Sequence, residues 1–262
     1  MIQTKSSSTS LVLDQGLDGV DLSARPRLVA PGSLLNLSST LISLSVGGTG
    51  LQGRFPNDVF RLPFLQKLSL TKNIDLRGNL PKSNWSSSLR FLDLSATSFS
   101  GQLPDAISAL IYLNVLDLSS SNFSGKLPDK IGNLRYLNVL DLHSNHFTGE
   151  VATSLSKLSQ LRSLDLSFNN FSRQIPDVFG NLSKLTDLDL SFNNFSGQLP
   201  PSAFNLPQLS LLDFSDNQFE GHIPYQVSGL SNLFSLDLCD NLLDGRVPSW
   251  LFTLPSLVTI RP

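Results

Sequence analysis

One leucine recurs at a constant interval, without a slip, through most of the chain. From each of these leucines the sequence reads Leu-x-x-Leu-x-Leu, then a turn, an apolar residue, a glycine and a proline. The ten recurring leucines are Leu41, Leu65, Leu89, Leu113, Leu137, Leu161, Leu185, Leu209, Leu233 and Leu257, each 24 positions after the one before (65 minus 41). A fixed period in this range predicts a solenoid, in which each unit buries its apolar face only against its neighbours. Such a molecule offers a long, open concave surface for binding.

The period also predicts how the chain is organised. Because it runs unbroken from 41 to 257 of 262 residues, no domain boundary fits inside it. Residues 41–262 hold nine full repeats and the start of a tenth, and residues 1–40 are predicted to be an irregular N-terminal segment with one degenerate repeat. Leu17, Val20 and Leu22 fit the phase of the repeat there, and another frame fits equally well. The chain is expected to be a piece of a longer protein.

Bulk composition excludes several classes of function. With 19 basic and 21 acidic residues, the chain has no excess charge for binding nucleic acid or an anionic membrane. Cys239 is the single cysteine, so no internal disulfide can form. No run of about 18 apolar residues predicts a membrane span. The first residues have no apolar h-region and do not resemble a secretory signal.

Each repeat is predicted to begin with a short strand. Counting the recurring leucine as position 1, apolar and polar residues alternate through positions 4 to 6, which is the period of a strand with one buried face. Parallel strands stack about 4.8 Å apart, so nine repeats would give a concave sheet on the order of 40 Å long. The fold class is therefore an α/β solenoid, a right-handed superhelix. The strands are centred on Leu44, Leu68, Leu92, Leu116, Leu140, Leu164, Leu188, Leu212 and Leu236.

The rest of the repeat is predicted to turn the chain back. A polar residue at position 9, mostly asparagine, can pair with orphaned backbone groups of the turn. Glycine and proline then lead into a return segment with short helical turns; Arg173 replaces that glycine in one repeat. A buried spine of apolar side chains is predicted between the turn and the glycine. Each buried ring contributes roughly 1.5–3 kcal/mol of transfer free energy to folding. Its members are Leu51, Phe99, Phe123, Phe147, Phe171, Phe195, Phe219 and Leu243.

The segments Phe123–Pro128 and Phe219–Pro224 carry a motif close to Leu-x-Gly-x-Ile-Pro after the strand. In this the chain resembles the plant-type leucine-rich repeats of extracellular receptors, over about residues 12–260. The irregular segments 19–24, 29–38 and 50–56 are similar to membrane-anchored receptor-like proteins used in disease resistance. The resemblance implies an ectodomain on the extracellular face of the plasma membrane, a peptide or protein ligand, and signalling through a partner receptor kinase as co-receptor.

Three functions remain open on this basis. The first is a ligand-recognition ectodomain fragment of a receptor-like protein, in pathogen perception and defence. The second is a soluble leucine-rich-repeat inhibitor of a secreted enzyme; such inhibitors carry cysteine-paired caps, which this chain lacks. The third is a truncated, non-signalling remnant. Because no phosphate loop, metal-spaced cluster or catalytic triad is found, and His143, His146 and His222 lie apart from a second ligand, we expect no enzyme, cofactor or metal.

Positions 3, 5, 7 and 8 are predicted to face outward from the concave sheet. Position 5 forms a ladder of carboxylates. It is either an acidic stripe for a cationic or hydroxyl-rich ligand, or simply the strand sequence Leu-Asp-Leu-Ser that is common in repeats of this class. At about 5 Å in water, neighbouring charges repel by only around 1 kcal/mol, so the ladder is tolerable without a ligand. Its members are Asp93, Asp117, Asp141, Asp165, Asp189, Asp213 and Asp237.

Phe168 and Phe192 occupy position 8 of adjacent repeats. Aromatic rings exposed together on a polar face are typical anchors for a protein partner, although the rings can also lie flat on the sheet. The candidate ligand-binding residues are Phe168, Phe192, Asp165, Asp189, Asp213 and His143. Six sequons predict N-glycosylation if the parent protein is secreted, at Asn36, Asn84, Asn122, Asn170, Asn181 and Asn194.

Overall fold

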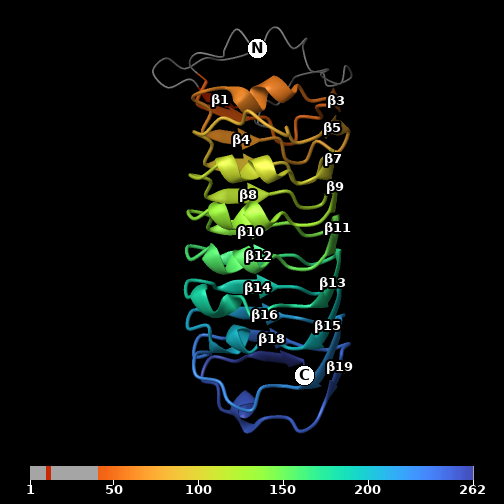
Figure 1. Ribbon diagram of the computed structural model, residues 1–262, viewed down its shortest axis with the longest axis vertical. Helices are drawn as coiled ribbons and strands as arrows, with labels where there is room; N and C mark the ends of the chain where they lie inside the picture. Colours follow the sequence, from red (N-terminus) through yellow and green to blue (C-terminus); the bar gives the residue numbers. More distant parts are fainter. Residues whose placement is uncertain (1–9, 13–40, 262) are drawn as a thin grey trace, which may run out of the picture.

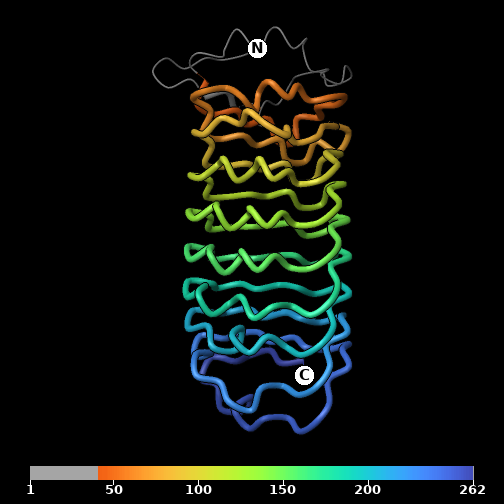
Figure 2. The backbone as a smooth tube through the Cα atoms, viewed as in Figure 1, coloured from red at the N-terminus to blue at the C-terminus, as the bar shows by residue number. Residues whose placement is uncertain are grey.

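The computed structural model describes residues 10–12 and 41–261. The described chain forms one elongated stack of coils, each lying next to its sequence neighbours along the long axis (Figures 1 and 2). One parallel sheet runs the length of the stack, and its strands alternate along the chain with those of a second sheet. The predicted solenoid with a parallel concave sheet is confirmed.

The first sheet, called the inner sheet below, contains the strand predicted in every repeat. Neighbouring strands pair in register at the period of the sequence repeat, as in Leu140 with Leu164. The nine leucines at position 4 are at most 3% exposed, which confirms the predicted register. The strands are β1 (Ser10–Val12), β2 (Ser43–Ser45), β4 (Lys67–Ser69), β6 (Phe91–Asp93), β8 (Val115–Asp117), β10 (Val139–Asp141), β12 (Ser163–Asp165), β14 (Asp187–Asp189), β16 (Leu211–Asp213), β18 (Ser235–Asp237) and β20 (Thr259–Arg261).

The N-terminal strand departs from the period. β1 pairs with β2 through Ser10 and Ser43, so these partners are further apart in sequence than one repeat (43 minus 10 is 33). The in-phase residues Leu17, Val20 and Leu22, and most of the predicted degenerate repeat, lie outside the described residues.

The second sheet was not predicted. Its strands pair at an offset slightly shorter than the repeat, as in Gly101 with Phe123 (123 minus 101 is 22). Most begin at the spine residue or just before it, and in most repeats the glycine of this segment has a positive φ, 93° at Gly101, where glycine lacks the Cβ clash of other residues. The strands are β3 (Gly53–Arg54), β5 (Leu76–Gly78), β7 (Ser98–Gln102), β9 (Asn122–Gly125), β11 (His146–Gly149), β13 (Asn170–Gln174), β15 (Asn194–Gln198), β17 (Gln218–His222) and β19 (Leu242–Asp244).

The return segments form short 3₁₀ helices. Pro128 precedes one of them, and its carbonyl accepts the first i to i+3 hydrogen bond, from the Ile131 amide at 3.0 Å. Their apolar residues, such as Ile131, are buried against the spine. The helices are η1 (Asn57–Arg61), η2 (Asp105–Ala109), η3 (Asp129–Asn133), η4 (Thr153–Lys157), η5 (Phe179–Asn181), η6 (Pro201–Asn205) and η7 (Ser249–Phe252).

The phenylalanine spine fills the core between the two sheets. Five consecutive rings, from Phe123 to Phe219, stack with centroids 5.9–6.4 Å apart and interplanar angles of 5–21°. All of the spine phenylalanines are fully buried, as predicted, while Leu51 and Leu243 near the two ends are only partly buried. The spine is thus continuous from coil to coil.

A ladder of asparagine side chains at position 9 ties neighbouring coils together. The Asn145 amide donates from Nδ2 to the carbonyls of Leu118 (2.8 Å) and Leu142 (3.1 Å), which belong to two coils. Its Oδ1 accepts the backbone N–H of Phe123 at 2.9 Å. The same pattern recurs at Asn73, Asn169, Asn193, Asn217 and Asn241. The predicted pairing with orphaned backbone groups is confirmed.

We predict that Phe171→Ala costs about 3–5 kcal/mol in the free energy of unfolding, because it opens a cavity between two stacked rings of the spine. Urea denaturation of the wild type and the variant measures this loss. A midpoint shift equivalent to less than about 1 kcal/mol would place the ring outside the core.

We predict that Arg173→Gly raises the free energy of unfolding by about 0.5–1 kcal/mol, because Arg173 takes the glycine position of its repeat. Its φ is 73°, a conformation that costs a residue with a side chain about 1–2 kcal/mol. The expected gain is smaller than this cost because glycine has more conformational freedom to lose on folding. The ion pair with Glu150 is 3.3 Å long but both side chains are mostly exposed, so its loss matters little. Urea denaturation measures the change, and a lower midpoint for the variant would contradict the strain argument.

Candidate functional site

The aspartate ladder closes the inner sheet at the carboxyl ends of its strands. Asp165 shows the arrangement: its Oδ1 accepts the backbone N–H of Ser167 at 2.9 Å and the Ser167 hydroxyl at 2.6 Å. The carboxylates of Asp93, Asp117, Asp189 and Asp213 are held in the same way. One oxygen of each carboxylate therefore serves the turn, and the ladder is structural as well as acidic.

The predicted outward orientation of position 7 is wrong for four of the five repeats in which it is a turn serine; the fifth, Ser95, is half-buried. Ser119, Ser167, Ser191 and Ser215 are at most 4% exposed. The reason is the hydrogen bond to the preceding aspartate, which draws the hydroxyl in toward the sheet. The exposed concave face is therefore made chiefly by positions 3, 5 and 8.

Ionisation of five ladder aspartates is less favourable in the folded chain than in water. The pKa values of Asp117, Asp141, Asp165, Asp189 and Asp213 are all raised, first because burial disfavours the ionised form. Hydrogen bonds from the turn lower these pKa values, and the charge of a neighbouring aspartate raises them again. A cation or proton brought to this surface relieves the repulsion.

His143 is the one histidine among these aspartates. It takes position 7, and its Nδ1 lies 2.8 Å from Asp141 Oδ1 and 3.9 Å from Asp165 Oδ2. Its Nε2 lies 3.2 Å from the Ser120 hydroxyl. Burial lowers the pKa of His143, but the Asp141 hydrogen bond and the charges of Asp141, Asp165 and Asp117 outweigh it, and the pKa is raised.

These groups also converge more closely than the sequence spacing suggested. Asp141, His143 and Asp165 offer three ligand atoms that lie within 4.8 Å of one another, so the expectation that His143 lies apart from a second metal ligand is wrong. The parallel register brings Asp165 beside them from the next coil. Three ligands could hold a cation, but a closed tetrahedral zinc site takes four.

Phe168 and Phe192 form an exposed aromatic pair, each three residues after a ladder aspartate. Their ring centroids lie 4.1 Å apart with an interplanar angle of 11°, and the side chains are 52% and 44% exposed. Because the rings stack against each other, they do not lie flat on the sheet. Both residues have φ at 52°, a left-handed conformation that is unusual for a bulky side chain. Two coils thus present one continuous apolar ridge.

The described residues place these six candidates on one stretch of the inner sheet. Asp165, Asp189 and Asp213 end the neighbouring strands β12, β14 and β16, and pair in register. Phe168 and Phe192 follow two of these strands in sequence, and His143 follows β10. The predicted grouping of rings and carboxylates is therefore spatially coherent.

Five of the six sequon asparagines are exposed, and Asn36 falls outside the described residues. Asn122, Asn170 and Asn194 stand at the starts of β9, β13 and β15, so they follow one line along the second sheet. Asn181 ends η5, and Asn84 lies in the coil before Arg90. Glycans on β9, β13 and β15 would stand on the second sheet and not on the inner sheet.

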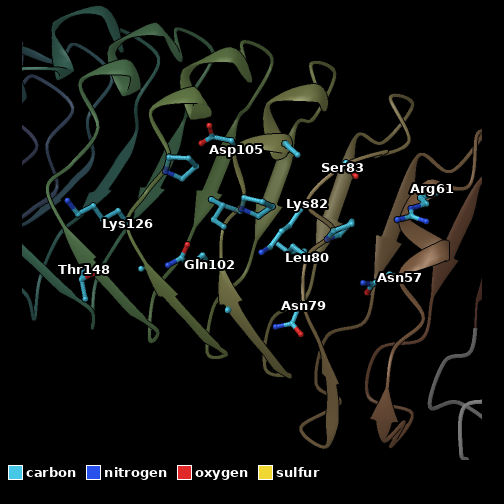
Figure 3. A pocket seen from close by; sticks show the side chains of 17 residues that line it. Asn57, Arg61, Asn79, Leu80, Lys82, Ser83, Gln102, Asp105, Lys126 and Thr148 are labelled. Carbon is cyan, nitrogen blue, oxygen red and sulfur yellow. The ribbon is translucent and has the colours of Figure 1, made fainter.

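A groove of about 1340 Å³ with a mixed polar and apolar lining lies beside η1 and η2 (Figure 3). Arg61 and Asp105 stand on the helical side, and Gln102 and Lys126 lie nearer the second sheet. Arg61 is paired with Asp58 at 3.3 Å, and Asp105 with Lys130 at 3.1 Å. The groove belongs to a different face from the aspartate ladder, and sequence patterns did not indicate it.

Comparison with protein families agrees with this architecture. Residues 84–194 match the family model of a leucine-rich repeat region, and residues 184–206 and 208–230 match that of the leucine-rich repeat. The chain belongs to the leucine-rich-repeat family. Its similar proteins include plant receptor-like proteins and plant receptor ectodomains.

This leucine-rich-repeat chain is 45% identical over 74 residues to receptor-like protein 6 of Arabidopsis thaliana, a match that covers 28% of this chain and 7% of the relative. Among solved structures it is similar to the ectodomain of the plant membrane receptor kinase GASSHO1/SCHENGEN3 from Arabidopsis thaliana in complex with CASPARIAN STRIP INTEGRITY FACTOR 2. There the TM-score is 0.79 and the identity 35%, over 84% of this chain and 26% of that one.

It is also similar to the Arabidopsis receptor kinase HAESA in complex with the peptide hormone IDA and the co-receptor SERK1. The TM-score is 0.65 and the identity 31%, over 83% of this chain and 40% of that one. The leucine-rich-repeat chain thus spans well under half of each of these relatives. In the part of the chain that the structure describes, no helix is both long and apolar enough to span a bilayer.

We predict that His143→Asn destabilises the chain more at pH 6 than at pH 8. The pKa of His143 is raised above its ordinary 6.5 in the folded state, so its stabilisation is fully present below pH 6.5 and is lost as pH rises through the folded pKa. Urea denaturation at both pH values measures the difference, with His146→Asn as the matched control. Equal losses for His143→Asn at the two pH values would show that the aspartates do not hold the charged imidazole.

Proposed function

We propose that this leucine-rich-repeat chain is part of the ligand-recognition ectodomain of a receptor-like protein, and that it binds a peptide or protein on the concave face. The observation that carries the proposal is the stacked, half-exposed pair Phe168 and Phe192 beside the aspartate ladder. Hot spots of protein interfaces favour aromatic anchors that pack against a partner and exclude water.

The ladder defines the chemistry of the ligand. Asp165, Asp189 and Asp213 each have one oxygen bound to the turn, which leaves the other to accept a hydrogen bond. A ligand with an apolar side chain next to a lysine, arginine or amide group fits this arrangement. The rings supply affinity through burial, and the carboxylates orient the ligand and contribute less affinity of their own in water.

The wider biological setting is part of the same proposal. The resemblance to disease-resistance receptor-like proteins supports a role in pathogen perception, on the extracellular face of the plasma membrane. HAESA is seen in complex with the peptide hormone IDA and the co-receptor SERK1, which supports a peptide ligand and a receptor-kinase partner for the parent of this chain. The exposed sequons agree with passage through the secretory pathway, and recognition requires no catalytic step.

Two alternatives make different demands on the parent protein. A soluble inhibitor of a secreted enzyme needs a secretory signal and cysteine-paired caps but no membrane anchor. A non-signalling remnant needs none of the three. The flanking genomic or transcript sequence separates them, because a receptor-like parent encodes a signal peptide upstream and a membrane helix downstream.

We predict that Phe168→Ala with Phe192→Ala weakens ligand binding by about tenfold or more, because it removes the central apolar anchor. Peptides selected from a displayed random library on the immobilised wild-type chain serve as probes, and fluorescence polarisation measures their affinity. The selected sequences should combine basic and apolar residues.

Phe64→Ala with Phe234→Ala is the matched control, since these phenylalanines are 55% and 52% exposed but lie away from the ladder. It should leave the affinity within about twofold of wild type. If the Phe168 and Phe192 variant folds and binds every selected peptide as wild type does, recognition lies outside the ridge.

A further inference from the structure

Summed over the described chain, acidic and basic residues gather at opposite ends of the inner strands. Positions 4 to 8, at the carboxyl ends, hold nine aspartates and two cations, Lys72 and Arg261. Positions 21 to 24 and 1 to 3, which lead into the strands, hold seven cations and one acid, Asp187. Because all strands of the inner sheet are parallel, the two sets lie at opposite edges of it. The acidic edge is the ladder, and the opposite edge is basic.

The middle of the basic edge also carries two tyrosines. Tyr112 and Tyr136 stack with ring centroids 5.9 Å apart and an interplanar angle of 27°, and the side chains are 44% and 55% exposed. The Arg90 guanidinium carbon lies 5.5 Å from the centre of the Tyr112 ring, within the range of a cation–π interaction. Asn114 donates to the Tyr136 carbonyl at 3.0 Å, which holds that backbone segment. The surface is therefore ordered before a partner arrives.

Three arginines of this edge have no ion-pair partner among the described residues. Arg90, Arg135 and Arg162 are exposed, and none of them forms an ion pair with another described residue. By contrast, Arg61, the first of the seven cations in the chain, and Lys130 of η3 are each paired with an aspartate. Tyrosine and arginine are also the residue types that protein interfaces favour over the rest of the surface.

We propose that this edge, formed by Arg90, Tyr112, Arg135, Tyr136, Arg162 and Lys184, binds an extended acidic segment of a partner protein. Arginine meets carboxylates with paired hydrogen bonds, and the stacked tyrosines offer an apolar contact between the charges. From Arg90 to Lys184 the edge crosses four coil spacings of about 4.8 Å, about 19 Å in all, which fits about six extended residues. The site is distinct from the ridge formed by Phe168 and Phe192, and it prefers a ligand of the opposite charge.

The test uses a fluorescein-labelled hexaglutamate peptide as probe, with hexaglutamine as its uncharged counterpart, at about 50 mM salt to limit screening. Combined Arg90→Gln, Arg135→Gln and Arg162→Gln should weaken hexaglutamate binding by about tenfold or more. Arg54→Gln, Arg77→Gln and Arg246→Gln is the matched control, because it removes the same charge from exposed positions elsewhere. It should change the affinity by less than about twofold, and hexaglutamine should not bind.

Two further measurements make the result specific. Tyr112→Ala with Tyr136→Ala should also weaken binding, whereas Phe168→Ala with Phe192→Ala should leave it unchanged; thermal melting confirms that each variant is folded. Equal losses in both arginine triples would mean general electrostatic attraction and would overturn the proposal. Failure of hexaglutamate to bind would also overturn it, as would preference of this edge for an acidic oligosaccharide over the peptide.

Discussion

The asparagine ladder is the interaction on which the rest of the structure depends. At each turn the chain leaves backbone groups that neither sheet can satisfy, and in six of the nine described repeats one asparagine amide pairs them across two coils. An unpaired buried polar group costs about 1–3 kcal/mol, so a coil displaced along the stack would lose this pairing. The ladder therefore enforces the coil spacing, and that spacing aligns the phenylalanine rings, the leucines and the aspartates.

The same constraint explains why functional chemistry appears as lines along the molecule. A residue type that recurs at the repeat period falls on one line because the inner strands pair in register. Repetition alone produces surfaces such as the aspartate ladder, and its carboxylates are partly engaged in their own turns. Information about a particular ligand resides where the repeat is broken, as by Phe168 and Phe192 at a position occupied in neighbouring coils by serine or aspartate.

Period and side-chain alternation were enough to predict the solenoid, the position-4 leucines, the spine and the role of the asparagines. They failed where an outcome depends on contacts between coils or within a turn. Position 7 is polar and was predicted to face outward, but the hydrogen bond from Ser167 to Asp165 buries the serine side chain. The second sheet escaped notice because its pairing offset, as between Gly101 and Phe123, is shorter than the period, although the alternation of phenylalanine and glycine was a usable signal.

The candidate site was only partly accessible from sequence for a similar reason. Equal repeat positions identified the Phe168 and Phe192 pair, but whether such rings stack or lie flat depends on the backbone, which a positive φ directs away from the sheet. The Tyr112 and Tyr136 stack was missed because position 24 lies outside the strand, where alternation says nothing about exposure. A parallel solenoid necessarily separates the two ends of its strands into two edges. Opposite charges on those edges therefore allow one sheet to contact two partners of different chemistry at once.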